Sequence, residues 1–293
     1  MKQVTANVFT ATDYRGCNPT YVSTPDGVVV IDTPQLVSKV LEMKREIEPK
    51  GPVRFLINTE QHIDHIFGNH WFAGVCPVVS HEAMAPLFWV NPRHPDLYQV
   101  SLDIIQQQDS EGLPSMPSRE KYIVNHPNIT YSQRMTLLVG GQVFKLFHTP
   151  GHTEGQTAVY IPDEKVVVTG DTVFSHCQTW LQEADPEAWI ASLKLLETLD
   201  VDYIIPGHGP VVTKEYLSVQ ISFIREWVDA VGSAIAKGWT KEQSIEKISF
   251  LDRCPVDIGQ ESSGPMIQRL NVSRLYDYLT GQCAKVKCAG ASC

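Results

Sequence analysis

The stretch Thr59–His65, TEQHIDH, contains four candidate metal ligands within seven consecutive residues. It follows an apolar run, VRFLIN, at residues 53–58, and precedes an apolar and aromatic run, IFGNHWF, at residues 66–72. This order predicts a buried strand, a loop and then a helix. Carboxylate and imidazole groups are ordinary ligands of divalent metal ions. The candidate ligands in the loop are Glu60, His62, Asp64 and His65.

Three more candidate ligands follow short apolar runs farther along the chain, each beside a glycine. They are His152 in HTPGHT, Asp171 in TGDT and His208 in PGHG. A neighbouring glycine lets the backbone turn sharply and approach another segment closely. Loops at the ends of strands are where catalytic polar groups usually lie. A lone histidine or Gly-Asp pair is weak evidence, but the ordered set points to one metal site.

This ordered set resembles the pattern of the metallo-β-lactamase-fold superfamily, His-x-His-x-Asp-His followed by His, Asp and His on later loops. The resemblance covers roughly residues 20–209. It implies an α/β protein, a four-layer αββα sandwich with one or two metal ions at one edge of its sheets. It also implies that Glu60, His62 and His152 hold the first metal, that Asp64, His65 and His208 hold the second, and that Asp171 bridges the two.

Glu60 departs from the family pattern, which usually has histidine at this position. Three interpretations remain open: a metal ligand, a weak first site in an enzyme that works mainly with one metal, or a base that contacts a ligand or the substrate. The resemblance implies two divalent metal ions and favours zinc. An anionic ligand in place of a neutral imidazole also makes iron or manganese plausible.

The activity that the resemblance implies is hydrolysis of an ester, lactone or amide bond in a small molecule by a metal-bridging hydroxide, with Asp64 as a catalytic residue. Asp171 counts against a β-lactamase, because those enzymes typically have Cys or Ser there. A β-lactamase-like variant, a diiron oxidative enzyme and a catalytically silent binding protein nevertheless stay open as hypotheses. His176, five residues after Asp171, is a candidate for protonating the leaving group, or else a structural loop residue.

We interpret residues 1–293 as a single domain with an insertion at about 86–128 and a flexible tail at 282–293. The insertion is rich in proline and aromatic residues, and either covers the site or is a surface excursion. If it covers the site, four of its residues are candidates for contacting an apolar or aromatic substrate: Trp89, Arg93, His94 and Tyr122.

Strands and helices are expected on both sides of the insertion. The predicted strands are 4–9, 20–23, 28–31, 53–57, 77–80, 135–139, 143–147, 157–161, 165–169 and 203–205. The predicted helices are 36–48, 66–72, one within the insertion near 97–105, one beginning at 185–186, 213–237 and 266–279.

Composition limits the partners. A net charge of −9 argues against a nucleic-acid partner, because phosphate binding needs a basic face. No apolar run is long enough for a membrane span, and the first residues lack the apolar core of a signal peptide. We therefore expect a cytoplasmic protein with a small-molecule substrate. The apolar faces of the C-terminal helices would permit a homodimer.

Overall fold

The computed structural model describes residues 1–88 and 96–282. Its strands form two sheets, one of seven strands in the order β1-β2-β3-β4-β5-β6-β7 and one of five in the order β12-β11-β10-β9-β8. The strands are β1 (Lys2–Gln3), β2 (Val8–Thr10), β3 (Thr20–Thr24), β4 (Gly27–Ile31), β5 (Val53–Ile57), β6 (Val78–His81), β7 (Ile129–Tyr131), β8 (Arg134–Val139), β9 (Gln142–His148), β10 (Thr157–Ile161), β11 (Val166–Phe174) and β12 (Tyr203–His208).

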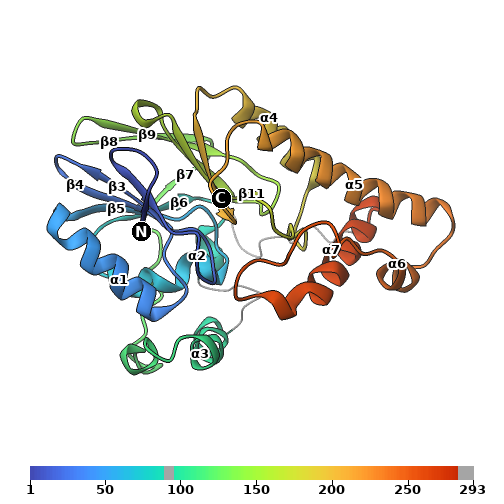
Figure 1. The fold of residues 1–293 in the computed structure, drawn as a ribbon, viewed down its shortest axis with the longest axis horizontal. Helices are drawn as coiled ribbons and strands as arrows, with labels where there is room; N and C mark the ends of the chain where they lie inside the picture. The colour runs from blue at the N-terminus through green and yellow to red at the C-terminus, as the bar shows by residue number, and fades with distance from the viewer. Residues whose placement is uncertain (89–95, 283–293) are drawn as a thin grey trace, which may run out of the picture.

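Helices pack on the outer faces of both sheets (Figure 1). The α-helices are α1 (Val37–Ile47), α2 (Ile63–Ile66), α3 (Leu97–Gln108), α4 (Pro186–Glu197), α5 (Tyr216–Ala236), α6 (Lys241–Lys247) and α7 (Gly264–Leu279). Short 3-10 turns are η1 (Glu48–Lys50), η2 (Phe67–Phe72), η3 (Ala85–Phe88), η4 (Leu113–Ser115), η5 (Pro162–Glu164) and η6 (Glu261–Ser263).

The alternation of side chains along the strands produces the layers. In β4, Val28 and Val30 pack in the cluster that contains α1, whereas Val29 and Ile31 pack in the cluster between the two sheets. Successive residues of a strand point to opposite faces, so a continuous apolar run is buried on both sides. In β11, Val167 likewise faces α4 and α5 while its neighbours face the other sheet. These three packed interfaces make a four-layer αββα sandwich, which confirms the predicted fold class.

Most predicted elements are present, with shifted bounds. Asp185 caps α4 by accepting a hydrogen bond from Ala188 N, as expected from Pro186 in the first turn. The predicted strand at 4–9 is shorter, because only Val8–Thr10 pairs with β3. The predicted helix at 66–72 begins earlier, at Ile63, and continues only as a 3-10 turn. Besides the 3-10 turns, three elements were not predicted: the two-residue strand β1, the three-residue strand β7 and the helix α6.

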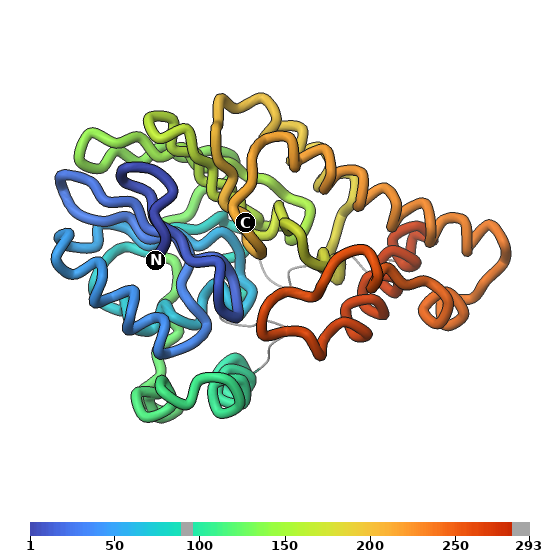
Figure 2. The backbone as a smooth tube through the Cα atoms, in the orientation of Figure 1, coloured from blue at the N-terminus to red at the C-terminus, as the bar shows by residue number. Residues whose placement is uncertain are grey.

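The segment after α5 returns to the sheet edge near α2 (Figure 2). Its loop before η6 contacts two other parts of the chain, since Gly259 O accepts hydrogen bonds from Arg15 Nη1 and Gln108 Nε2. Gln108 is the last residue of α3, so the N-terminal loop, the α3 segment and the C-terminal segment meet at one carbonyl. No helix in the described ranges has the length and apolar character to cross a membrane.

Candidate metal centre

The seven candidate ligands come from loops, from the short helix α2 and from the strands β11 and β12 at one edge of the sandwich. β5 leads directly into the stretch that carries Glu60 and His62, and His62 is the extended residue that precedes α2. Asp64 and His65 therefore lie in the first turn of a helix. On the other sheet, β11 pairs in parallel with β12, with Gly170 opposite Pro206 and Phe174 opposite His208. This register brings Asp171 and His208 to the same edge.

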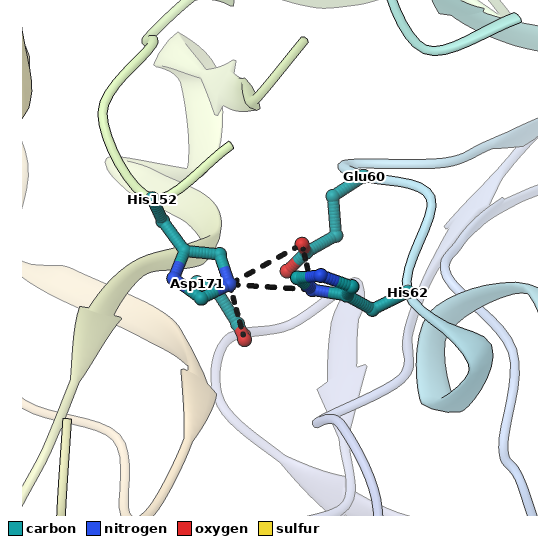
Figure 3. Close-up of side chains that lie close together, drawn as sticks. All are labelled: Glu60, His62, His152 and Asp171. Atoms are coloured by element: carbon teal, nitrogen blue, oxygen red, sulfur yellow. Dashed lines mark hydrogen bonds and ion pairs between the residues drawn. The ribbon is translucent and has the colours of Figure 1, made fainter. Parts of the chain in front are cut away.

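Four side chains converge in the first group, as Figure 3 shows. Glu60 Oε2 lies 2.6 Å from His62 Nδ1. His152 Nε2 lies 3.3 Å from His62 Nδ1 and 3.5 Å from Glu60 Oε2. Asp171 Oδ2 lies 3.5 Å from the same nitrogen of His152. One donor atom from each of these four buried residues lies within 4.8 Å of all the others.

The second group contains Asp64, His65 and His208, whose donor atoms also lie within 4.8 Å of one another. His208 Nε2 is 3.3 Å from Asp64 Oδ2 and 3.4 Å from Asp171 Oδ1. His65 Nε2 is 3.2 Å from Asp171 Oδ1. The two oxygens of Asp171 therefore face different groups, Oδ2 the first and Oδ1 the second.

Glu60 is shared in the same way. While its Oε2 faces the first group, its Oε1 lies 3.2 Å from His65 Nε2 of the second group. A histidine has two ring nitrogens on opposite sides and would not present two adjacent donors in this manner. The replacement of histidine by glutamate thus adds a second carboxylate between the groups.

Several of these buried atoms lack hydrogen-bond partners within the described residues: Glu60 Oε1 and Oε2, His65 Nε2 and Asp171 Oδ1. Buried polar groups are almost always satisfied, so such orphans need an explanation. The atoms belong to residues of the two groups, whose donor atoms lie within 4.8 Å of one another, so a cation in each group could accept their lone pairs. Divalent metal ions fit this donor set of carboxylates and imidazoles.

The outward nitrogen of every histidine in the site faces an acceptor. His62 Nε2 lies 3.3 Å from Glu183 Oε1, and His65 Nδ1 lies 2.9 Å from Asp32 Oδ2. His152 Nδ1 lies 2.9 Å from the Trp180 carbonyl oxygen, and His208 Nδ1 lies 2.7 Å from Asp257 Oδ2. Donation of an N–H to these acceptors leaves the inward nitrogen with a free lone pair, which is the tautomer that a metal ligand requires.

The electrostatics of the site follow from this crowding. Burial alone would lower the pKa of His65 and His208, but the neighbouring carboxylates, together with Cys17 in the case of His65, raise the pKa of both well above the ordinary value. Burial opposes ionisation of Asp171, yet His208 and His65 hold its pKa well below the usual range. Burial lowers the pKa of His152. Without metal ions, protons on the histidines supply the positive charge that the carboxylates need.

Glycines permit the close approach, as their positions beside the candidate ligands suggested. A Cβ atom on Gly207 would lie 1.9 Å from Asp171 Oδ1. Gly209 has a φ of +84°, and a Cβ there would lie 1.8 Å from the Ser175 carbonyl oxygen. Only glycine therefore lets the His208 loop pack against β11.

A cavity of about 370 Å³ opens above the two groups. Asp64, His152, Asp171 and His208 line it from below. Its walls include apolar residues from α3 and α7, together with polar residues and one tryptophan from four loops: Val100, Ile104, Met266, Leu270, Arg15, Gln35, Trp180, Gln182 and Gln260. A volume in this range suits a small-molecule ligand.

The predicted substrate-contacting residues do not line this cavity where they are described. Tyr122 stacks on Phe67 and His70, and its hydroxyl donates to the Phe67 carbonyl oxygen. His176 is exposed and packs beside Tyr216. Trp89, Arg93 and His94 lie outside the described residues. The α3 segment contributes to the wall instead through Val100 and Ile104.

Sequence reasoning missed the residues that support the histidines. Asp32 directly follows β4, which is the strand-end position that identified the other candidates, so the same criterion could have found it. It also accepts hydrogen bonds from the amide and hydroxyl of Thr59. Glu183 and Asp257 stand in loops without a motif, and only the tertiary structure reveals them.

Comparisons with known proteins agree with this arrangement. The family model described as the metallo-beta-lactamase superfamily matches residues 12–208, which is more than half of the chain. A metallo-beta-lactamase family protein from Thermus thermophilus has a TM-score of 0.67 at 17% identity, with 95% of each chain covered. At this identity, the likeness concerns the fold alone.

Two curated relatives are named as hydrolases. A linear primary-alkylsulfatase from a Pseudomonas species is 23% identical over 262 residues, 78% of this chain and 49% of its own. A hydroxyacylglutathione hydrolase from Bartonella henselae is 34% identical over 93 residues, 31% of this chain and 37% of its own. The chain thus spans half or less of the length of these relatives.

Proposed function

The chain belongs to the metallo-beta-lactamase superfamily, and from this premise we propose that it is a dinuclear metallohydrolase that opens an ester, lactone or amide bond in a small molecule. The relatives named as hydrolases support the reaction class. The specific bond and the two-metal composition are our proposals.

The observation that carries the proposal is the pair of shared carboxylates. Glu60 and Asp171 each direct one oxygen toward the first group and the other toward the second. Three of these four oxygens have no hydrogen-bond partner in the described part of the chain. A single ion would leave part of this buried anionic surface uncompensated, which is costly. Two cations, one per group, would compensate all of it.

The proposed ligands are Glu60, His62 and His152 for the first cation and Asp64, His65 and His208 for the second, with Asp171 and Glu60 shared. Two divalent cations at this site would supply a nucleophilic hydroxide at neutral pH and polarise the bond under attack. Asp64 lines the cavity and can accept a proton there, while its Oδ2 faces His208. The apolar side chains that α3 and α7 contribute to the walls would contact an apolar part of the substrate.

Metal identity depends on the carboxylates. Three anionic ligands, Glu60, Asp64 and Asp171, would neutralise more of the metal charge than the two aspartates of the family pattern. Oxygen ligands suit manganese and iron as well as zinc. We propose zinc as the family default, with iron or manganese competing because of Glu60.

A sulfate ester is a second candidate substrate. It is favoured by the alkylsulfatase relative, which matches 78% of this chain, and by the apolar walls of the cavity.

The test combines metal analysis with a panel of lactones, thioesters, carboxylic esters, alkyl sulfates, β-lactams and phosphoesters. We expect two equivalents of metal per chain and hydrolysis that a chelator abolishes. Asp64→Asn should abolish turnover with the fold retained, because it removes a carboxylate that only the site uses.

Asp229→Asn is the matched control, since Asp229 is exposed on α5 far from the cavity. Full turnover by Asp64→Asn would contradict the role of Asp64. Bound iron with visible absorption and oxygen-dependent turnover would replace the hydrolase proposal by an oxidative one. A protein that binds no metal in metal-replete medium would favour a silent binding protein.

A further inference from the structure

Arg15 places a guanidinium group in the wall of the cavity, beside the second group of ligands. It is half-buried on the loop between β2 and β3. Its Nε donates to Gln35 Oε1 at 3.2 Å, and its Nη1 donates to the Gly259 carbonyl oxygen. Within residues 1–88 and 96–282, no hydrogen bond engages Nη2. Two contacts therefore orient the group and leave donors for a ligand.

The loop that carries Arg15 is fastened to the metal centre. Asn18 N donates to the Gly207 carbonyl oxygen at 2.7 Å, and Asn18 Nδ2 donates to the carbonyl oxygens of Pro206 and Gly209 at 2.9 and 2.7 Å. A Cβ atom on Gly16 would lie only 3.5 Å from Asp64 Cβ. Arg15 thus has a defined position relative to both Asp64 and the His208 loop.

The charges around Arg15 keep it cationic. Burial lowers its pKa, but Asp64, Asp257 and Glu261 act in the opposite direction. An arginine in proteins does not lose its proton under ordinary conditions. These carboxylates also suggest an alternative role for Arg15, which is to balance their negative charge within the protein. Binding of an anion by Arg15 differs from charge balance in one respect, because only binding makes the effect of Arg15 depend on the charge of the substrate.

Four apolar side chains from two helices also line the cavity. Val100 and Ile104 of α3 and Met266 and Leu270 of α7 line it. Met266 is 48% exposed, so this wall extends to the solvent at the mouth of the cavity.

We propose that the cavity accepts an anionic amphiphile, with its anionic group on Arg15 and its apolar group against α3 and α7. This inference rests on the proposed function and names its substrate class. The anion is either a carboxylate next to the scissile ester or the scissile group itself, as in an alkyl sulfate. A planar guanidinium matches the oxygens of both.

The kinetic test uses two p-nitrophenyl esters with the metal-loaded protein. One is the half-ester of glutaric acid, which carries a free carboxylate, and the other is the neutral hexanoate. For the wild type, we expect a higher kcat/KM for the anionic ester. Arg15→Met should lower the ratio of kcat/KM, anionic over neutral, by about 10-fold to 100-fold, mainly through KM, because a charge-assisted contact is lost.

Three further variants sharpen this test. Arg15→Lys keeps the positive charge but lacks the planar guanidinium, so its ratio of kcat/KM should lie between those of Arg15→Met and the wild type. It also keeps the proposal testable if Arg15→Met misfolds. Arg15→Glu should lower the ratio further than Arg15→Met. Arg134→Met, at an exposed position on β8, should leave the ratio as in the wild type. Equal losses on both esters in the Arg15 variants would overturn the inference and assign charge balance to Arg15, while the proposed hydrolase would stand.

Binding gives a readout that is independent of turnover. Calorimetric titration with hexanesulfonate, a weak metal ligand, should show binding that Arg15→Met weakens about 10-fold or more, whereas hexanol should bind equally to both. Binding of hexanesulfonate that does not change in Arg15→Met would refute the inference. Release of sulfate from hexyl sulfate would identify the scissile group as the anion, and hydrolysis of the half-ester alone would identify the carboxylate. If no substrate of either charge is hydrolysed, the proposed function fails, whatever the titration shows.

Discussion

Removal of the Asp257 carboxylate should weaken binding of the second metal ion selectively. Asp257 is buried, and its Oδ2 lies 2.7 Å from His208 Nδ1, on the side of the ring opposite to the site. In Asp257→Ala, the ring loses the acceptor that fixes its tautomer and orientation. His208 then has to be reoriented when the metal binds.

The size of the effect follows from the geometry. A hydrogen bond to a charged group contributes about 1.5–3 kcal/mol. Loss of a partner that supports a metal ligand typically costs about 10–100-fold in affinity, which is about 1.4–2.7 kcal/mol. The two ranges agree. Because the hydrogen bond of Asp257 is short and buried, we expect an effect in the upper half of the affinity range, so the Kd of the second metal should rise about 30–100-fold.

The assay is competition with a chromophoric chelator at neutral pH, which resolves the two metal ions by their affinities. The Kd of the first metal should change little, because His62 and His152 have different outward partners. Asp252→Asn is the control, since Asp252 is exposed in the same loop. Equal weakening of both metal ions, or unchanged binding of both, would refute the reasoning about His208. Urea unfolding of the metal-free variant separates this effect from a general loss of stability.

Three other expectations follow. Gly209→Ala should lower the free energy of unfolding by about 1–3 kcal/mol because of the left-handed backbone alone, and the clash with the Ser175 carbonyl oxygen should lower it further. Urea unfolding measures this free energy. A stability equal to that of the wild type would contradict the packing described. In the metal-free protein, burial opposes protonation of His65 and His208, but neighbouring carboxylates raise the pKa of both above the ordinary 6.5. The protonated histidines therefore stabilise the fold fully below about pH 6.5, and this contribution is lost as the pH rises through the raised pKa. Calorimetry should show a Tm that falls with rising pH, and a rising Tm would be inconsistent with protonated histidines. Glu60→His should tighten binding of the first zinc ion and reduce cooperativity between the two ions, because a carboxylate shared by the two groups is lost. Competition with a chelator measures the affinity and the cooperativity. Unchanged cooperativity would contradict the role of Glu60 as a shared carboxylate.

The fold and the assembly of the site were largely predictable because their signals are local. The stretch 59–65 directly follows an apolar run, the other three candidate ligands stand beside a glycine, and parallel strands end at a common edge. Residues 60–65, His152, Asp171 and His208 are accordingly found together. The roles of these seven residues as ligands stay predictions that metal analysis can test.

What the sequence did not reveal depends on distant contacts or on weak signals. Arg15 lines the cavity and Asp257 supports His208 only because the N-terminal loop and the segment after α5 fold back onto the His208 loop. Tyr122 was expected to contact a substrate in the cavity. Its ring instead stacks on Phe67, which attaches the segment after α3 to η2. The helix α6 does carry a local signal, a capping box formed by Thr240 and Gln243, which a closer inspection would detect.

The contacts of Asn18 have a consequence for biosynthesis. They join a residue near the start of the chain to the His208 loop, about 190 positions later, and Asp257 supports that loop from still farther along. Contacts between such distant positions form late, because the intervening chain must first be synthesised and closed into a loop. A nascent chain that has been synthesised only as far as residues 60–65 contains four of the seven candidate ligands and lacks the His208 loop and its contacts. We therefore expect the proposed metal ions to bind stably only after the segment that carries Asp257 has left the ribosome.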